Sequence, residues 1–248
     1  MPPRGQESAP FFSAPQPSEP LVQGKRLDGR GPAEFRNIHL RAGVVGKAQG
    51  SCYGELGTTK VMVGVYGPKQ ASRAQGYSER AALNCEVKYA AFATRTRAPA
   101  GLAEEEQDAS LQLRRTLESA LMLHLYPKTS IDVFVTVIES GGSDAALITA
   151  AASMAVAHAG IAMADLLPSC CVVRLGQQLL MDPTDVEEAA CDGQMMVTMT
   201  ARRGEVSQMV SRGEWPGDTS QAALQLAAEG CAALDELMRE TLREALEA

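Results

Sequence analysis

The chain has 248 residues, a formal net charge of −7, 45% hydrophobic residues and only 4% aromatic residues. This length can form one large domain or two small ones with real cores, and the composition is typical of a globular α/β-like protein rather than a disordered or fibrous one. A protein that grips nucleic acid by itself is more often basic, so the acidic balance argues against that class. No apolar run reaches the roughly 18 residues that a membrane span needs.

Residues 1–24 are rich in proline and serine and contain no apolar stretch of the signal-peptide type. We therefore predict a disordered tail over 1–24 that is not a secretory signal, followed by one domain over 25–248. The six cysteines form no CxxC pair and the three histidines lie far apart, which argues against a zinc site. We expect buried free thiols in a reducing compartment, and neither a metal site nor a cofactor.

The first half of the domain begins with strands. Apolar and alternating runs predict strands over 37–43, 50–56, 60–67 and 85–93. The segment 57–59 reads as a hairpin turn between the second and third strands.

A helix is expected near residues 108–125, because Leu113, Leu117, Ala120, Leu121 and His124 share one helical face. The acidic segment 103–110 leads into this helix and suits the positive end of its dipole. The helix is expected to end at Tyr126-Pro127. A strand over 130–140 follows, and after it an alanine-rich helix that closes near Gly160.

The second half repeats this scheme loosely. Strands are predicted over 169–175, 178–182, 194–200 and 205–211. A long helix begins near Asp218 or Thr219, and its apolar stripe predicts core packing. The order of elements predicts an α+β fold with helices packed on antiparallel hairpins.

Two motifs have residues suited to chemistry. Gly141-Gly142-Ser143 precedes the alanine-rich helix, and a helix that opens on small residues offers free N–H groups to a phosphate. Simple capping by such a turn is the more common case, and Asp144 would repel an anion bound there. The segment 182–192 carries five carboxylates and no basic residue, as in a Mg²⁺ site or, more commonly, a solvated acidic loop.

Four segments taken in order resemble the RNase PH family: RLDGR at 26–30, the run 50–69, the run 139–161 and MDPTDVEEAACDGQMMVTMT at 181–200. The resemblance implies a pseudo-repeated α+β domain like the second domain of ribosomal protein S5. It also implies a ring of six such domains around a channel for single-stranded RNA. Active members cut RNA from its 3′ end with inorganic phosphate.

The chain departs from active members at three places. In those members an arginine follows the Gly-Gly-Ser/Thr turn and holds the phosphate, whereas Asp144 follows Ser143 here. At ~4 Å and an effective dielectric near 20, one unit charge pair is worth about 4 kcal/mol, and its sign is reversed. Active members also carry two aspartates six residues apart, where we align Glu188 and Asp192, which are four apart. The acidic segment 103–108 lies where active members tend to bring arginines.

These departures imply a non-catalytic RNase PH-like subunit of the eukaryotic RNA exosome core, with no catalytic residue and no metal. The expected partners are other RNase PH-like subunits in a heterohexameric ring, S1/KH-type cap subunits and single-stranded RNA in the channel, with no membrane. The expected location is the nucleus and nucleolus, and also the cytoplasm. The alternatives are an active phosphate-dependent 3′–5′ exoribonuclease and, with weaker support, a free-standing RNA-binding protein.

The charge along the chain is uneven. Residues 69–97 are net basic and residues 216–248 are net acidic. By resemblance, direct RNA contact is expected from Lys88, Arg95 and Arg97, with Arg73 and Arg80 as outer candidates.

Overall fold

The computed structural model describes residues 21–22, 25–70, 79–94, 102–200 and 202–247. The predicted disordered tail over 1–24 therefore lies almost entirely outside the described residues. Within the described part of the chain, no helix is long and apolar enough to cross a membrane. A two-stranded ribbon, β1 (Leu21–Val22) with β2 (Lys25–Arg26), precedes two larger sheets.

The first sheet has five strands in the order β3-β4-β5-β7-β6. Its strands are β3 (Ile38–Ala42), β4 (Gly50–Leu56), β5 (Thr59–Gln70), β6 (Ala82–Tyr89) and β7 (Thr129–Glu139). β4 and β5 form the expected hairpin, in which Gly57 takes a φ of 59° at the turn. β6 runs parallel to β7, so the chain must cross over between them, and helix α1 (Leu102–Ala120) lies in this crossover.

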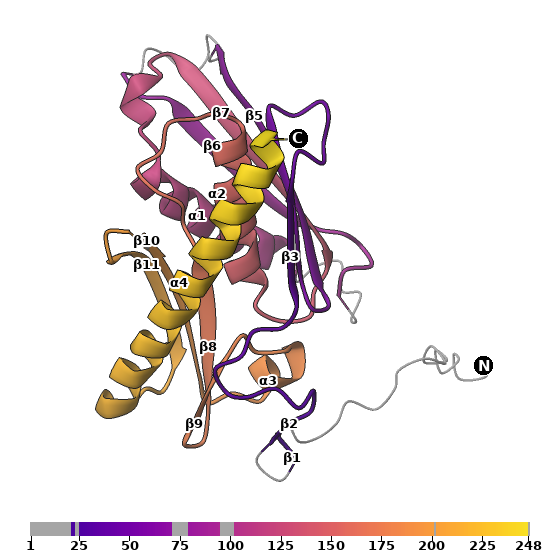
Figure 1. Ribbon diagram of the computed structural model, residues 1–248, viewed down its shortest axis with the longest axis vertical. Coiled ribbons are helices and arrows are strands. Elements are labelled where there is room, and N and C mark those ends of the chain that lie inside the picture. Colours follow the sequence, from indigo (N-terminus) through magenta and orange to yellow (C-terminus); the bar gives the residue numbers. More distant parts are fainter. Residues whose placement is uncertain (1–20, 23–24, 71–78, 95–101, 201, 248) are drawn as a thin grey trace, which may run out of the picture.

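The second sheet has four strands in the order β11-β10-β8-β9, all antiparallel. Its strands are β8 (Ser169–Leu175), β9 (Gln178–Met181), β10 (Gly193–Thr200) and β11 (Glu205–Gly213). The short helix α3 (Asp185–Ala189) connects β9 to β10. Helix α4 (Gly217–Glu247) packs on β8 and β10 and extends to β3 of the first sheet (Figure 1).

Helix α2 (Asp144–His158) lies at the centre of the molecule. It contacts β4, β5 and β7 of the first sheet and β8 and β10 of the second. Every residue from Ala146 to Val156 is buried, as expected for a helix that is apolar all round. The N-terminus of α2 therefore opens at the junction of the two sheets, where the Gly-Gly-Ser turn enters it.

The predicted strands and the central helix are confirmed with small shifts, but α1 differs from the prediction. It begins at Leu102, so Glu104 and Glu105 lie in its first turn rather than before it. It ends at Ala120, because Leu121 instead pairs with Met163 in an isolated β-bridge. The chain then forms a 3-10 turn (Leu123–Leu125), and His124 is exposed rather than on the buried face.

Close packing of α2 on β4 depends on Gly50. A Cβ at this position would lie 2.5 Å from Ala159 N and would also clash with Ala155 O, so only glycine lets the helix approach. We expect Gly50→Ala to lower the free energy of unfolding by about 2–3 kcal/mol, as overpacking against a backbone does. Denaturant unfolding of the full chain measures this change. Gly46→Ala is the matched control, because a Cβ there meets nothing within 4 Å; equal effects of the two substitutions would contradict the packing argument.

Candidate functional site

The turn over 140–143 links β7 to α2, and neighbouring segments pack closely against its two glycines. Gly142 has a φ of 98°, and a Cβ there would lie 2.5 Å from Pro183 O. A Cβ on Gly141 would clash with the Thr58 side chain in the β4–β5 turn. Ser143 also has a positive φ, 58°, as the residue before α2. The glycines are therefore required by close approach as well as by conformation.

Buried Arg36 fixes the orientation of this turn. Its guanidinium donates to Gly141 O at 2.8 Å and to Gly142 O at 2.9 Å. It also forms a two-pronged ion pair with the buried carboxylate of Asp182, at 2.7 and 2.9 Å. Thr59 Oγ1 donates to Gly142 O at 2.7 Å. The carbonyl groups of Gly141 and Gly142 are thereby held on the side of the turn that faces Arg36.

The N–H group of Ser143 meets a carboxylate of the same chain. It donates to Glu188 Oε1 at 2.9 Å, and Glu188 comes from α3. A helix N-terminus attracts negative charge through its free N–H groups and its dipole. In this protein Glu188 supplies that charge internally.

Asp144 is the first residue of α2 and lines the same pocket as Ser143 and Glu188. Its Oδ2 accepts a hydrogen bond from Ser140 Oγ at 2.6 Å, whereas its buried Oδ1 has no hydrogen-bond partner among the described residues. Burial raises the pKa of Asp144, against the opposing effects of Ser140 and the Arg36 charge. Burial also raises the pKa of Glu188 to about 7; the Ser143 N–H opposes this shift and the nearby Asp144 charge adds to it. The two carboxyls therefore lie in a poorly solvated and mutually repulsive pair.

Gln194 also belongs to this site, next to Glu188, and was not identified from the sequence. Its side-chain amide donates to Glu188 Oε1 at 3.0 Å, and it follows Glu188 by six positions. Asp192, predicted to be the partner of Glu188, lies outside the group. It is about half exposed, accepts from Gly176 N at 2.7 Å and approaches Arg174 at 3.6 Å. Asp192 therefore does not pair with Glu188 in this site, and counting six residues from Glu188 leads to Gln194.

These groups line an open cavity of about 290 Å³. We call it the acidic pocket and define it by four carboxylates, the Tyr89 ring, Gln194 and Arg212. The carboxylates are those of Glu105 and Asp108 from α1, Asp144 from α2 and Glu188 from α3. Arg212 of β11 is the basic residue among the described lining.

The acidic pocket does not fit a bound Mg²⁺. Over the described residues, no three histidine, cysteine, aspartate or glutamate side chains are grouped as metal ligands. The partner that closes on Glu188 is the amide N–H of Gln194, and a donor cannot face a cation.

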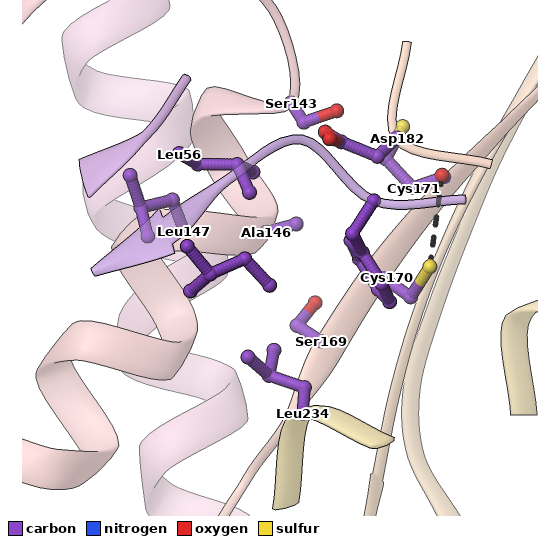
Figure 2. Close-up of a pocket in the computed structure, with 11 residues that line it drawn as sticks. Leu56, Ser143, Ala146, Leu147, Ser169, Cys170, Cys171, Asp182 and Leu234 are labelled. Atoms are coloured by element: carbon purple, nitrogen blue, oxygen red, sulfur yellow. Dashed lines mark hydrogen bonds between the residues drawn. The ribbon is translucent and has the colours of Figure 1, made fainter. Parts of the chain in front are cut away.

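A second cavity lies behind the turn and has a different character. Figure 2 shows Ser143 and Asp182 at one end of it and leucine, alanine, cysteine and serine side chains around the rest. Its volume is about 10 Å³, at the lower limit of the space that one water needs. This cavity is a packing gap under the turn, so the chemistry of the site belongs to the acidic pocket.

The residues predicted to contact RNA are only partly placed. Lys88 lies on β6 with 65% of its side chain exposed and pairs with Glu86 at 2.9 Å. Arg80, just before β6, is exposed. Arg73, Arg95 and Arg97 lie outside the described residues. The structure thus places Lys88 and Arg80 at the surface. The contacts expected of Arg73, Arg95 and Arg97 stay predictions.

The raised pKa of Glu188 predicts a pH-dependent stability. The folded protein holds this proton up to about pH 7, whereas an unfolded Glu releases it near pH 4.5, so stability from this group is fully present below about 4.5 and is lost as the pH rises through 7. We expect Glu188→Gln to remove this loss and to be more stable than the wild type at pH 8, by on the order of 1–3 kcal/mol.

Denaturant unfolding between pH 4.5 and 8 measures the difference. Glu187→Gln on the same helix is the contrasting variant, because Glu187 forms a buried ion pair with Arg26 at 2.7 Å and its loss should destabilise the fold. A constant difference between wild type and Glu188→Gln over this pH range would count against a raised pKa.

Comparison with known proteins places these features in context. A family model described as "3' exoribonuclease family, domain 1" matches residues 34–162, and the model for domain 2 of the same family matches residues 167–230. The division between the two matches falls between α2 and β8, where the chain passes from the first sheet to the second.

Curated relatives and solved structures agree with this match. The chain is 40% identical to "Exosome complex component RRP41-like" of Arabidopsis thaliana, over 90% of this chain and 86% of that protein. It is 36% identical to "Exosome complex component RRP41" of Homo sapiens, over 90% and 94% of the two chains. The rice (Oryza sativa) Rrp46 structure has a TM-score of 0.77 at 23% identity, covering 88% of this chain and 100% of that one. A chain of an Archaeoglobus fulgidus exosome with RNA in its active site has a TM-score of 0.74 at 21% identity, covering 86% and 92%. These likenesses confirm the predicted fold.

Proposed function

Because the chain belongs to the 3′ exoribonuclease (RNase PH) family, we propose that it is a ring subunit of the eukaryotic RNA exosome that performs no phosphorolysis itself. In this role it helps to form the RNA channel for 3′–5′ processing and decay, including rRNA processing and mRNA turnover. The observation that carries the proposal is the Ser143 N–H bound to Glu188 beside the unpaired Oδ1 of Asp144.

A phosphate nucleophile would face two carboxyls at this position. The nearby cation, Arg36, is already engaged by Asp182 and by two turn carbonyls, so its donors point away from the pocket. Each unit charge at ~4 Å from a phosphate contributes about 4 kcal/mol at an effective dielectric near 20, here with the unfavourable sign for a carboxylate. The pocket therefore opposes the reactant that phosphorolysis requires.

Gln194 lies where active members, by resemblance, carry a second aspartate that phosphorolysis requires. By resemblance, active members place two aspartates at this spacing, one as a metal ligand and one as a general acid. An amide has no titratable proton to give to a leaving group. Gln194 instead holds Glu188 in place through a 3.0 Å hydrogen bond. An exoribonuclease activity would need both changes to be reversed.

Within the ring, DPT at 182–184 and AAEGCAAL at 227–234 resemble the mRNA-transport-type subunit, exosome component six, whereas the curated relatives described above are RRP41-type. Its proposed partners are homologous RNase PH-like chains in a heterohexamer, the S1/KH-type caps and single-stranded RNA. Lys88, with Arg95 and Arg97, is proposed to contact the RNA backbone in a sequence-independent and salt-sensitive way. The proposed location is the nucleus, nucleolus and cytoplasm.

The first test of this function is chemical. In a ring whose other subunits lack activity, we expect no phosphate-dependent release of nucleoside diphosphate from single-stranded RNA with Mg²⁺. Asp144→Arg alone should remain inactive, because Gln194 still occupies the place of an aspartate, and loss of one such contact typically lowers a rate by about 10²-fold or more. Phosphate-dependent release by the unmodified chain, abolished by Glu188→Gln but not by Asp192→Asn, would establish the exoribonuclease instead.

The second test concerns assembly. The uneven charge along the chain favours side-specific contacts with different neighbours, since complementary charge selects partners. We expect sedimentation to show a defined heteromeric ring when this chain is mixed with its homologues. A stable homohexamer formed by this chain alone would oppose the proposal.

A further inference from the structure

One face of the five-stranded sheet is buried against helices and the other is open. Helix α2 packs on β4, β5 and β7, and the β5 side chains on that side, Val61, Val63 and Val65, are fully buried. Helix α1 packs on β6 and joins the same hydrophobic core. The alternate β5 side chains, Met62 and Tyr66, point to the other side and are only half-buried. We call this second side the outer face.

The centre of the outer face is aromatic and apolar. The strand register places Met62 between Tyr53 of β4 and Thr136 of β7, one row from Phe134. The rings of Tyr66 and Phe134 meet edge to face, with centroids 5.8 Å apart. Phe134 is nevertheless 44% exposed. Aromatic residues and methionine are enriched in protein interfaces relative to the rest of a protein surface.

The rim of the outer face is charged but internally balanced. Three lysines each form an ion pair with an acid of the same sheet: Lys60 with Glu139, Lys88 with Glu86 and Lys69 with Asp132. Arg41 and Glu55 add one charge of each sign. A surface that binds single-stranded RNA carries an excess of cations, so this face suits a protein rather than RNA. Lys88 lies on the edge strand β6, at the rim, so this conclusion is compatible with its proposed RNA contact.

The outer face is also large enough for a stable contact. Five strands about 4.8 Å apart, over the seven residues of β4, span roughly 24 Å in each direction, or about 600 Å² in projection. Side-chain relief makes the accessible area larger than this projection. A standard interface buries about 800 Å² on each partner, so this one face can supply one side of it.

We propose that the outer face is the surface by which this chain contacts a neighbouring RNase PH-like chain of the ring. This inference rests on the proposed ring function and names the surface that serves it. In the contact, Phe134 and Met62 are covered by the neighbour, whereas the paired charges stay at the hydrated rim.

Phe134→Ser tests the proposal in the full chain mixed with its homologues. We expect the concentration required for half-maximal incorporation into the ring, measured by sedimentation, to rise about tenfold or more. Leu246→Ser is the matched control, because it removes an apolar side chain that is 82% exposed in the last turn of α4. It should leave incorporation unchanged.

Thr136→Glu is the second variant, and circular dichroism confirms that each variant is folded. Thr136 is exposed and lies opposite Met62, so this substitution places a charge at the centre of the outer face without removing a packed side chain. It should impair incorporation as Phe134→Ser does.

The outcomes separate this inference from the proposed function. A wild-type chain that enters no ring with its homologues would overturn both. A ring that wild type and both outer-face variants enter equally well would overturn the inference alone. An intact ring in which Phe134→Ser weakens the binding of single-stranded RNA would assign the face to RNA and overturn the inference as well.

Discussion

The buried ion pair between Arg36 and Asp182 is the interaction on which the site depends. Arg36 precedes the first sheet, Asp182 follows β9 of the second, and the guanidinium also binds both carbonyls of the Gly-Gly turn. A buried pair of this kind is weak evidence for stability but constrains geometry strongly, because the guanidinium is held by Asp182 and by the backbone carbonyls of the turn at the same time. The pair thereby fixes which side of the turn carries carbonyls and which carries the N–H groups that begin α2.

The residues that hold the turn in place are different from the residues that face the acidic pocket. Arg26 binds Glu187 and two backbone carbonyls, so the start of the domain is tied to α3 by a second buried pair. Neither pair includes Asp144, Glu188 or Gln194. A chain can therefore keep the turn, the glycines and the arginines for folding while the residues that face the pocket change. This separation explains how the sequence resembles its family closely at a site with altered charge.

The sequence predicted most strands because each is a short apolar run bounded by glycine or a polar turn, as at β4 and β8. It missed the end of α1, because the bridge between Leu121 and Met163 is a tertiary contact that periodicity does not report. It also pointed to Asp192 as the partner of Glu188, because a second carboxylate was expected there, whereas the residue at the family's spacing of six is Gln194. The role of Arg36 could not be predicted, since its partners lie 105 and 146 positions away.

The N-terminus of α2 still attracts an anion, as any helix start does. In this protein the anion is Glu188, which is covalently part of the fold and cannot leave. Its burial beside Asp144 opposes ionisation, so its pKa rises to about 7 and the acidic pocket is more negative above neutral pH than below it. Because Glu188 lines the acidic pocket, the affinity of the pocket for any charged ligand therefore depends on pH. A cation brought to the pocket would lower the pKa of Glu188, and by linkage protonation of Glu188 would release the cation.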